Sequence, residues 1–260
     1  MIPMMGEICL ARKRRVKRME QSLRRQDERT AYLLGTDGVA RIRRASVIVF
    51  GIGGVGSYCA EALARAGVGR LTLVDFDRVS ESNINRQLVA LHSTVGRYKT
   101  EVMAERIRDI NPDCLVDTRE EMLLPENADD FDLSGYDFVV DAVDTVAAKV
   151  ELAVRGEMCG VPVVSCMGAG NKLDPTQFTV TDIYETSGDP LARVMRNRLR
   201  KAGVKHLTVI CSREEAHALH PSMEDAVAAG ERRAPGSLSF VPSTAGLVAA
   251  SVVLRAISGV

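Results

Sequence analysis

Residues 45–77 read ASVIVFGIGGVGSYCAEALARAGVGRLTLVDFD, and this stretch decides the fold. A short apolar run at 47–50 precedes a glycine-rich turn, and an alanine-rich helical segment precedes a second apolar run at 71–74. Short runs rich in β-branched residues are typical of strands buried on both faces of a parallel sheet. A strand, a glycine turn, a helix and a strand within about thirty residues predict a βαβ unit.

The same alternation continues on both sides of this stretch. Upstream, the sequence predicts helices over 22–35 and 38–44, with Gly35 ending the first. Downstream, it predicts, in order, a helix over 99–110, strands over 114–122 and 136–144, a helix over 147–159 and a strand over 162–170. Strands that alternate with helices predict an α/β fold with a doubly wound, Rossmann-like, mostly parallel sheet flanked by helices.

After Gly170 the pattern changes. Residues 176–185 alternate at period two, which predicts an antiparallel strand added in the C-terminal half. The segments that follow are a basic helix over 190–203, a strand over 206–212, a polar loop over 212–235 and an apolar closing helix over 244–257. We expect three parts: a solvated basic arm over 1–21, with Met19 as an alternative start, a nucleotide-binding core over 22–170, and 171–260 as a continuation of the same domain.

Composition excludes several classes of protein. The 260 residues are 46% hydrophobic and 26% charged, which suits one globular domain or slightly more. The formal net charge is zero, so any binding of nucleic acid must come from local basic patches. The six cysteines include no C-x-x-C pair, which argues against a zinc knuckle and suits a reducing cytoplasm. We expect no membrane span, because no apolar run approaches the roughly 20 residues that one needs.

The glycine-rich turn predicts a phosphate site. Gly51, Gly53 and Gly56 match G-x-G-x-x-G, with Gly54 inside the motif, between a predicted strand and a predicted helix. These glycines permit a tight turn, close approach of phosphate to the backbone, and packing of helix on strand. Asp75 follows the second strand, where a carboxylate accepts hydrogen bonds from ribose hydroxyls. The motif predicts a nucleotide and leaves NAD and ATP open.

Charged residues beyond the glycine turn favour ATP. Arg86 and Lys99 follow the second strand on the side of the nucleotide crevice, and breaking a triphosphate requires neutralising charge of this kind. Asp141 and Asp144 end the fourth predicted strand, at the edge where α/β folds bind ligands. A carboxylate there can hold Mg²⁺ against phosphate oxygens.

Taken together, the motifs GIGGVGS, LVDFD, SNINRQ, VGRYK and DAVDT resemble those of the ubiquitin-activating-like adenylating enzymes, over roughly residues 29–171. The resemblance implies that the glycine turn and Asp75 hold adenosine, and that Asp144 works with the metal. It also implies that several residues after Asp75 bind the phosphates and promote adenylation. The nucleotide-contacting residues expected after Asp75 are Asp77, Asn83, Arg86 and Lys99. An N-terminal arginine, Arg29 with Arg25 as the rival, is expected to reach into the site of a partner subunit.

The second half resembles one branch of that superfamily. GAGNKLDPTQ at 168–177, DPLARVMR at 189–196 and PGSLSFVPSTAG at 235–246 are similar to motifs of the tRNA threonylcarbamoyladenosine dehydratases. The resemblance implies an ATP-dependent adenylating cyclase that dehydrates N6-threonylcarbamoyladenosine at position 37 of tRNA by adenylating the threonyl carboxylate. It further implies a homodimer, with the need for a sulfur-mobilising partner left open.

A tRNA substrate calls for basic surface. Arg193, Arg196 and Arg200 recur at helical spacing, Lys201 and Lys205 lie nearby, and Arg232 and Arg233 add charge to the polar loop. Because the attacking group is part of the substrate, the chemistry needs no enzyme cysteine, and Cys166 and Cys211 are expected to be packing residues.

Three other functions remain open at this point. Adenylation of a small sulfur-carrier protein is the first alternative, although members that activate such carriers usually have C-x-x-C pairs, which this sequence lacks. An inactive nucleotide-binding scaffold and an NAD oxidoreductase are the others.

Overall fold

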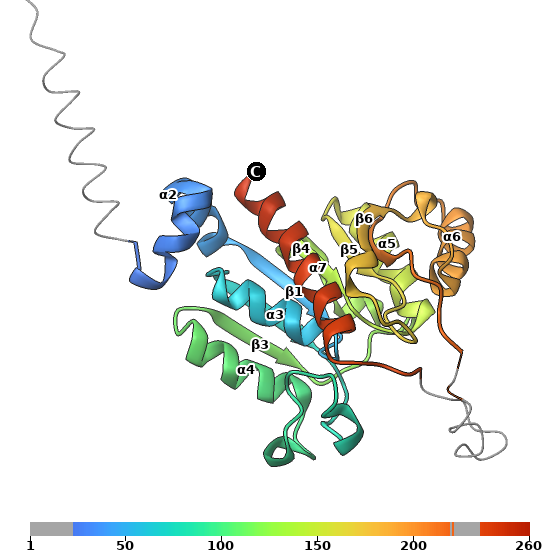
Figure 1. Ribbon diagram of the computed structural model, residues 1–260. Coiled ribbons are helices and arrows are strands. Elements are labelled where there is room, and N and C mark those ends of the chain that lie inside the picture. Colours follow the sequence, from blue (N-terminus) through green and yellow to red (C-terminus); the bar gives the residue numbers. More distant parts are fainter. Residues whose placement is uncertain (1–22, 219, 221–234) are drawn as a thin grey trace, which may run out of the picture.

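The computed structural model describes residues 23–218, 220 and 235–260 (Figure 1). The expected arm over 1–21 lies outside these residues, as does most of the polar loop, including Arg232 and Arg233. The described chain folds into one seven-stranded sheet with helices on both faces. The α/β fold class predicted from the sequence is therefore confirmed.

The sheet is parallel except at one edge. Its strands are β1 (Ser46–Phe50), β2 (Arg70–Val74), β3 (Leu115–Arg119), β4 (Phe138–Asp141), β5 (Val163–Cys166), β6 (Phe178–Asp182) and β7 (Thr208–Ser212). Their spatial order is β3-β2-β1-β4-β5-β7-β6, and only β6 runs antiparallel to its neighbour, β7. Because the chain leaves β1 toward β2 and later returns beside β1 as β4, the order reverses between these strands. Ligands of doubly wound folds bind at this position, beyond the carboxyl ends of the strands.

The helices follow the predicted order with small shifts in their ends. They are α2 (Glu28–Arg44), α3 (Gly56–Arg65), α4 (Lys99–Ile110), α5 (Val146–Cys159), α6 (Pro190–Ala202) and α7 (Phe240–Ser258). Single 3-10 turns occur at Arg25–Asp27, Glu81–Asn83, His92–Thr94, Ala128–Asp130, Leu133–Gly135, Pro175–Gln177 and Ile183–Glu185. The first helix begins at Glu28 rather than at residue 22, and Gly35, with φ 68° and ψ 169°, breaks it into the two predicted helices.

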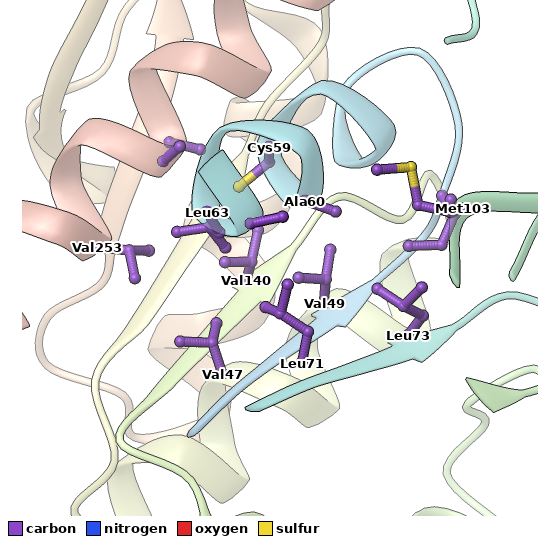
Figure 2. Close-up of a cluster of buried hydrophobic side chains, with 14 of the residues drawn as sticks. Val47, Val49, Cys59, Ala60, Leu63, Leu71, Leu73, Met103, Val140 and Val253 are labelled. Carbon is purple, nitrogen blue, oxygen red and sulfur yellow. The ribbon is translucent and has the colours of Figure 1, made fainter. Parts of the chain in front are cut away.

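Alternating strand residues divide the core into two layers. Val47 and Val49 face a cluster completed by α3, α4 and α7, which Figure 2 shows with Leu63 of α3 against the strands. Ile48 and Phe50 face the opposite layer, which contains α5. Helix α6 packs beside α5 over the outer strands. Burial on both faces explains why β1 and β2 read as continuous apolar runs.

Helix α7 corrects one expectation from the sequence. The helix has 19 residues, and an 18-residue stretch of it has a mean hydropathy of 1.7, so by length and composition it could cross a membrane. The expectation that no apolar run approaches that length was therefore wrong for this helix. In the fold, α7 packs against α3, and Val241, Ala245 and Val253 lie in the core. These contacts account for its apolar composition, since one side of the helix is an interior surface.

Candidate functional site

The glycine turn connects β1 to α3 and has little room for side chains. Gly51 has φ 84°, and a Cβ there would lie 2.6 Å from the carbonyl oxygen of Ala142. A Cβ on Gly56 would lie 1.7 Å from the oxygen of Gly51, so this position also requires glycine. Gly53 has open space instead, with the nearest atom, Nε2 of Gln87, 3.7 Å from its Cβ position. The turn thus leaves the backbone accessible at the point where the motif predicts phosphate.

A cavity of about 530 Å³ lies at the carboxyl ends of β1, β2, β4 and β5. It is lined by most of the residues that the sequence nominated, namely Gly51, Gly53, Gly54, Asp75, Asp77, Asn83, Arg86, Lys99 and Asp144. Gly56 is not among the lining residues and serves the packing of α3 on β1 instead. Segments up to 93 residues apart in the sequence therefore meet around one space, which is the geometry that the triphosphate hypothesis requires.

Asp75 is held rigidly at the end of β2. Its Oδ2 accepts a hydrogen bond from the Ile52 amide at 2.6 Å, and its Oδ1 accepts one from the Asp77 amide at 2.9 Å. Burial raises the pKa of Asp75, and the nearby charge of Lys99 opposes that shift. Each carboxylate oxygen can accept a second hydrogen bond, so the group remains able to bind ribose hydroxyls.

The two predicted phosphate-binding cations differ in their surroundings. Lys99, at the first position of α4 and only 4% exposed, pairs with the Asp77 carboxylate at 2.7 Å. An incoming phosphate would compete with Asp77 for that ammonium group. The Arg86 guanidinium donates to the Ser82 carbonyl at 2.9 Å and to Oδ1 of Asn85 at 2.8 Å. Both acceptors are neutral, so the charge of Arg86 is available to an anion.

The two aspartates after β4 have separate roles. Asp141 is fully buried, and both of its carboxylate oxygens lie 3.1 Å from Nζ of Lys149, which is also fully buried. Ser165 donates a further hydrogen bond to the same carboxylate. Asp144 is exposed and lines the cavity. Of the pair that the sequence placed at this edge, only Asp144 can therefore face a ligand.

Sequence reasoning missed Lys149, because a lysine in an amphipathic helix is normally a solvated residue. Its Nζ also donates to the Cys166 carbonyl at 2.7 Å, which ties the ends of β4 and β5 to α5. Gln87 entered the sequence analysis only as the last residue of the SNINRQ motif. In the structure it is 9% exposed, lines the cavity, and has a buried Oε1 without a hydrogen-bond partner in the described chain.

The donor set fits Mg²⁺ bound partly by the nucleotide. Among the described residues there is no group of three His, Cys, Asp or Glu side chains that could hold a metal alone. Mg²⁺ commonly takes one or two carboxylates and completes its shell with phosphate oxygens and water. Asp144 provides such a carboxylate beside the cavity, whereas Asp141 is occupied by Lys149.

The second wall of the cavity comes from the last residue of β5 and from parts of the chain that follow it. It consists of uncharged residues, namely Cys166, Met167, Gly168, Ala169, Gly170, Leu191, Pro235, Ser237 and Pro242. The motifs GAGNKLDPTQ and PGSLSFVPSTAG, which lie more than fifty residues apart, meet here. The two motifs contact each other at Asn171 and Gly236. The Asn171 amide donates to the Gly236 carbonyl, and the Gly236 amide donates to the Asn171 side chain. Sequence reasoning recognised both motifs but assigned neither a role.

Arg29 is not near the cavity of its own chain. Its side chain is exposed on the first turn of α2, which leads directly into the start of β1. The second half of α2 packs beside the end of α7, where Arg41 donates to the Ser258 carbonyl. Helix α2 therefore lies at the amino ends of the strands, opposite the cavity. Any role of Arg29 in adenylation requires a second subunit.

The basic residues of α6 are only partly available. Arg196 donates to the Thr186 carbonyl at 2.9 Å, and Arg200 lies over the Tyr184 ring at 5.2 Å from its centre. Arg193 is exposed, as are Lys201 and Lys205. The helix thus presents a basic surface, although Arg196 is used to hold the turn before it.

The cysteines near the site are poor nucleophiles. Burial raises the pKa of Cys166 to about 12, although this residue lines the cavity. Burial likewise raises the pKa of Cys211 to about 11. Both thiols are protonated at neutral pH, as expected for packing residues.

Comparisons with known proteins agree with this geometry. The family model of the ThiF family matches residues 26–260. A Bacillus subtilis protein named tRNA threonylcarbamoyladenosine dehydratase is 44% identical over 230 residues, which cover 86% of this chain and 91% of that protein. The protein of the same name from Escherichia coli is 39% identical, over 87% of this chain and 91% of its own length.

Solved structures give the same result. The crystal structure of the E. coli dehydratase in complex with ATP has a TM-score of 0.81 and 38% identity, covering 91% of this chain and 95% of that one. The matched family covers nearly the whole chain, from before α2 to its last residue. On the extent of the match, this chain belongs to the ThiF family.

Proposed function

We propose that this protein is an ATP-dependent enzyme that dehydrates N6-threonylcarbamoyladenosine at position 37 of tRNA. The observation that carries the proposal is the single cavity that brings Asp75, Arg86, Lys99 and Asp144 to the glycine turn. Its two walls suit two different ligands: the charged residues suit the nucleotide, and the uncharged residues suit the neutral part of the acid next to its carboxylate. The extensive similarity to proteins named for this activity supports the choice of substrate.

The reaction is an adenylation followed by ring closure. A carboxylate oxygen of the threonyl group attacks the α-phosphorus of ATP, and pyrophosphate leaves with the electrons of the broken P–O bond. The resulting mixed anhydride is a better electrophile than the carboxylate, because AMP is a good leaving group. An atom of the neighbouring carbamoyl group attacks the activated carbonyl, AMP departs, and the attacking group loses its proton. The net change in the nucleoside is the loss of one water.

We call the side of the cavity that carries Asp75, Arg86, Lys99 and Asp144 the charged wall, and its residues perform the first step. Asp75 and the glycine turn fix adenosine, so that the α-phosphorus has a set position. Arg86 and Lys99 stabilise the negative charge that moves onto the pyrophosphate oxygens. Asp144 would hold Mg²⁺, which supplies further charge neutralisation when bound. The ring closure is intramolecular and so needs no cysteine nucleophile.

The functional unit that we propose is a homodimer in the cytoplasm. Exposed Tyr32 and Leu33 lie beside Arg29 on α2 and provide apolar surface for a second copy. A partner copy that docked there through the rim of its own cavity would bring Arg29 to that cavity. Arg193, Lys201 and Lys205 on and after α6 would contact phosphates of the tRNA backbone. A sulfur-mobilising partner protein is a further element of the proposal, to be tested by adding one.

The test is nucleoside mass spectrometry of tRNA that carries threonylcarbamoyladenosine, incubated with the protein, ATP and Mg²⁺. We expect the nucleoside to lose one water and AMP to appear in equal amount. Unchanged nucleoside, with exchange of pyrophosphate into ATP only when a sulfur-carrier protein is added, would replace this function with carrier activation. If pyrophosphate does not exchange into ATP with either the modified tRNA or a sulfur-carrier protein, the protein is an inactive nucleotide-binding scaffold.

A further inference from the structure

The uncharged wall of the cavity is held in place by two asparagines on opposite sides of the cavity. Residues 235–237 cross from the loop after β5 to the loop after β2. On the first side, the Gly236 amide donates to Oδ1 of Asn171 at 2.6 Å, and the Asn171 amide donates to the Gly236 carbonyl at 2.7 Å. On the other side, Nδ2 of Asn85 donates to the Ser237 carbonyl at 3.0 Å.

Asn171 has an unusual backbone conformation. Its φ of 56° is the only positive value among the described non-glycine residues, and asparagine tolerates this left-handed region better than most residues do. The Asn171 carbonyl also accepts a hydrogen bond from the His217 amide at 2.7 Å. Three backbone or side-chain groups of one residue are thus committed to neighbouring segments. Asn171 is therefore a fixed anchor point in the wall.

The contact between the two segments is also tight. A Cβ added to Gly170 would lie 2.6 Å from Cβ and 2.9 Å from Cγ of Pro235. Because the proline ring is rigid, a side chain at residue 170 would push Pro235 away from the loop. Gly170 and Pro235 both line the cavity, so their separation sets its width on this side.

The wall reaches the residues that would act on the triphosphate. Asn85 donates to Ser237 through Nδ2 and accepts from the Arg86 guanidinium through Oδ1. One side chain therefore connects the predicted phosphate-binding arginine to the uncharged wall. Pro242 packs against Gly54 of the glycine turn, 3.2 Å from its Cβ position. The uncharged wall therefore contacts both the glycine turn and the loop that carries Arg86.

We propose that residues 235–237 form the surface that positions the acyl group of the acid substrate, and that Asn171 is the positioning residue that holds this surface. The proposal rests on the function proposed above and names the part of the cavity that takes the acid. The surface offers small, uncharged side chains, the Ser237 hydroxyl and backbone groups, which suit the neutral part of the acid next to its carboxylate rather than a second phosphate. Asn171 acts by positioning Gly236. The residues of the charged wall, rather than Asn171, contact the reacting atoms.

The test separates the side-chain hydrogen bond from the backbone conformation. Asn171→Gly keeps the left-handed conformation available but removes the Oδ1 acceptor, whereas Asn171→Asp keeps an acceptor. In the protein without ligands, we expect hydrogen exchange at the Gly236 amide to accelerate about threefold to tenfold in Asn171→Gly, as for loss of one hydrogen bond, and to stay near wild type in Asn171→Asp. Equal exchange in wild type and Asn171→Gly would overturn the anchoring role.

A second pair of variants tests the consequence for the substrate. Gly170→Ala wedges Pro235 outward, and Gly135→Ala is its matched control, because a Cβ at Gly135 meets no atom within 4 Å. We expect Gly170→Ala and Asn171→Gly to raise KM for the modified tRNA about tenfold while calorimetry shows unchanged ATP affinity. Wild-type KM in both variants would overturn the substrate-positioning role. If the wild-type protein itself releases no water from the nucleoside, the proposed function fails, whereas the exchange result at Gly236 still reports on the anchor.

Discussion

The two walls of the cavity differ in the way the sequence specifies them. The wall beside β1 and β2 carries charged side chains in short motifs, so that Asp75, Arg86 and Lys99 occur within 25 residues. The opposite wall is made of uncharged residues from three segments that come together only in the folded chain. Charge with regular spacing can be recognised in a sequence. A neutral surface, whose function lies in its shape, cannot.

Removing Arg86 should have the largest effect on the charged wall. Within the described part of the chain its guanidinium hydrogen-bonds to neutral acceptors only, so we assign its charge to the transferring phosphoryl group. We expect Arg86→Ala to slow AMP formation by about 10³-fold or more, as for other arginines that act in phosphoryl transfer. The measurement is AMP release with modified tRNA, accompanied by thermal unfolding to show an intact cooperative transition.

Arg78→Ala is the matched control for this variant. Arg78 stacks on the Tyr98 ring, 3.7 Å from its centre, and is not among the residues that line the cavity. Its removal should leave AMP formation near the wild-type rate. Equal losses in the two variants would remove the distinction between the charged wall and the surrounding surface.

The aspartates after β4 allow the same distinction to be made within one turn. Asp141→Asn leaves Lys149 charged and buried without its carboxylate, so we expect a loss of about 3 kcal/mol or more in the free energy of unfolding. Asp144→Asn should leave stability within about 0.5 kcal/mol of wild type, since Asp144 is exposed. Urea unfolding measures the first effect.

The activity of the Asp144→Asn variant completes the test. We expect it to lose Mg²⁺-dependent AMP formation while keeping its fold, because the exposed carboxylate is the one that faces the cavity. An active Asp144→Asn, or an Asp141→Asn that unfolds at the same urea concentration as wild type, would contradict the division of roles between the two residues.

Mixing two inactive variants tests whether the charged wall is completed by a second subunit. Arg29→Ala and Arg86→Ala should each be inactive alone. In a dimer of one chain of each kind, one of the two cavities receives an intact Arg86 and an intact Arg29. With random mixing in a symmetric dimer, about a quarter of wild-type activity per cavity should return. Mixtures that stay inactive, while size-exclusion chromatography shows exchanged dimers, would remove Arg29 from the site.

The fold could be predicted nearly in full, because its signals are local. The helix predicted over 99–110 is α4, and Gly203, with φ 80°, ends α6 where the sequence placed its end. The glycine turn and Asp75 were found because their spacing follows from the geometry of one βαβ unit. Even the antiparallel edge strand, β6, was visible in the sequence as alternation at period two.

The remaining features depend on contacts between distant segments. The pairing of Asp141 with Lys149 joins a strand end to a helix, and neither residue differs in sequence from an ordinary turn aspartate or surface lysine. The contact of Asn171 with Gly236 spans 65 residues. Such contacts arise when distant segments pack together, so no regular spacing of residues in the sequence predicts them. The sequence motifs at 168–177 and 235–246 marked these positions without explaining them.

The smallest predicted effect concerns the pH dependence of nucleotide binding. Burial raises the pKa of Asp75, so its carboxylate takes up a proton at higher pH than an ordinary aspartate does. Protonation removes an acceptor for a ribose hydroxyl, and the affinity should therefore fall as pH decreases through this raised pKa. The loss of one hydrogen bond corresponds to roughly fivefold in affinity. Titration with adenosine avoids protonation of the phosphates of ATP.

Two variants determine whether this pH dependence belongs to Asp75. Asp75→Asn cannot take up the proton, so its weaker adenosine binding should not change over the same pH range. Lys99→Met should move the transition to higher pH, because the Lys99 charge opposes the rise in the Asp75 pKa. A wild-type profile that parallels that of Asp75→Asn would show that the carboxylate does not contact the ribose. Nucleotide binding by the charged wall would then rest on the glycine turn and the cations alone.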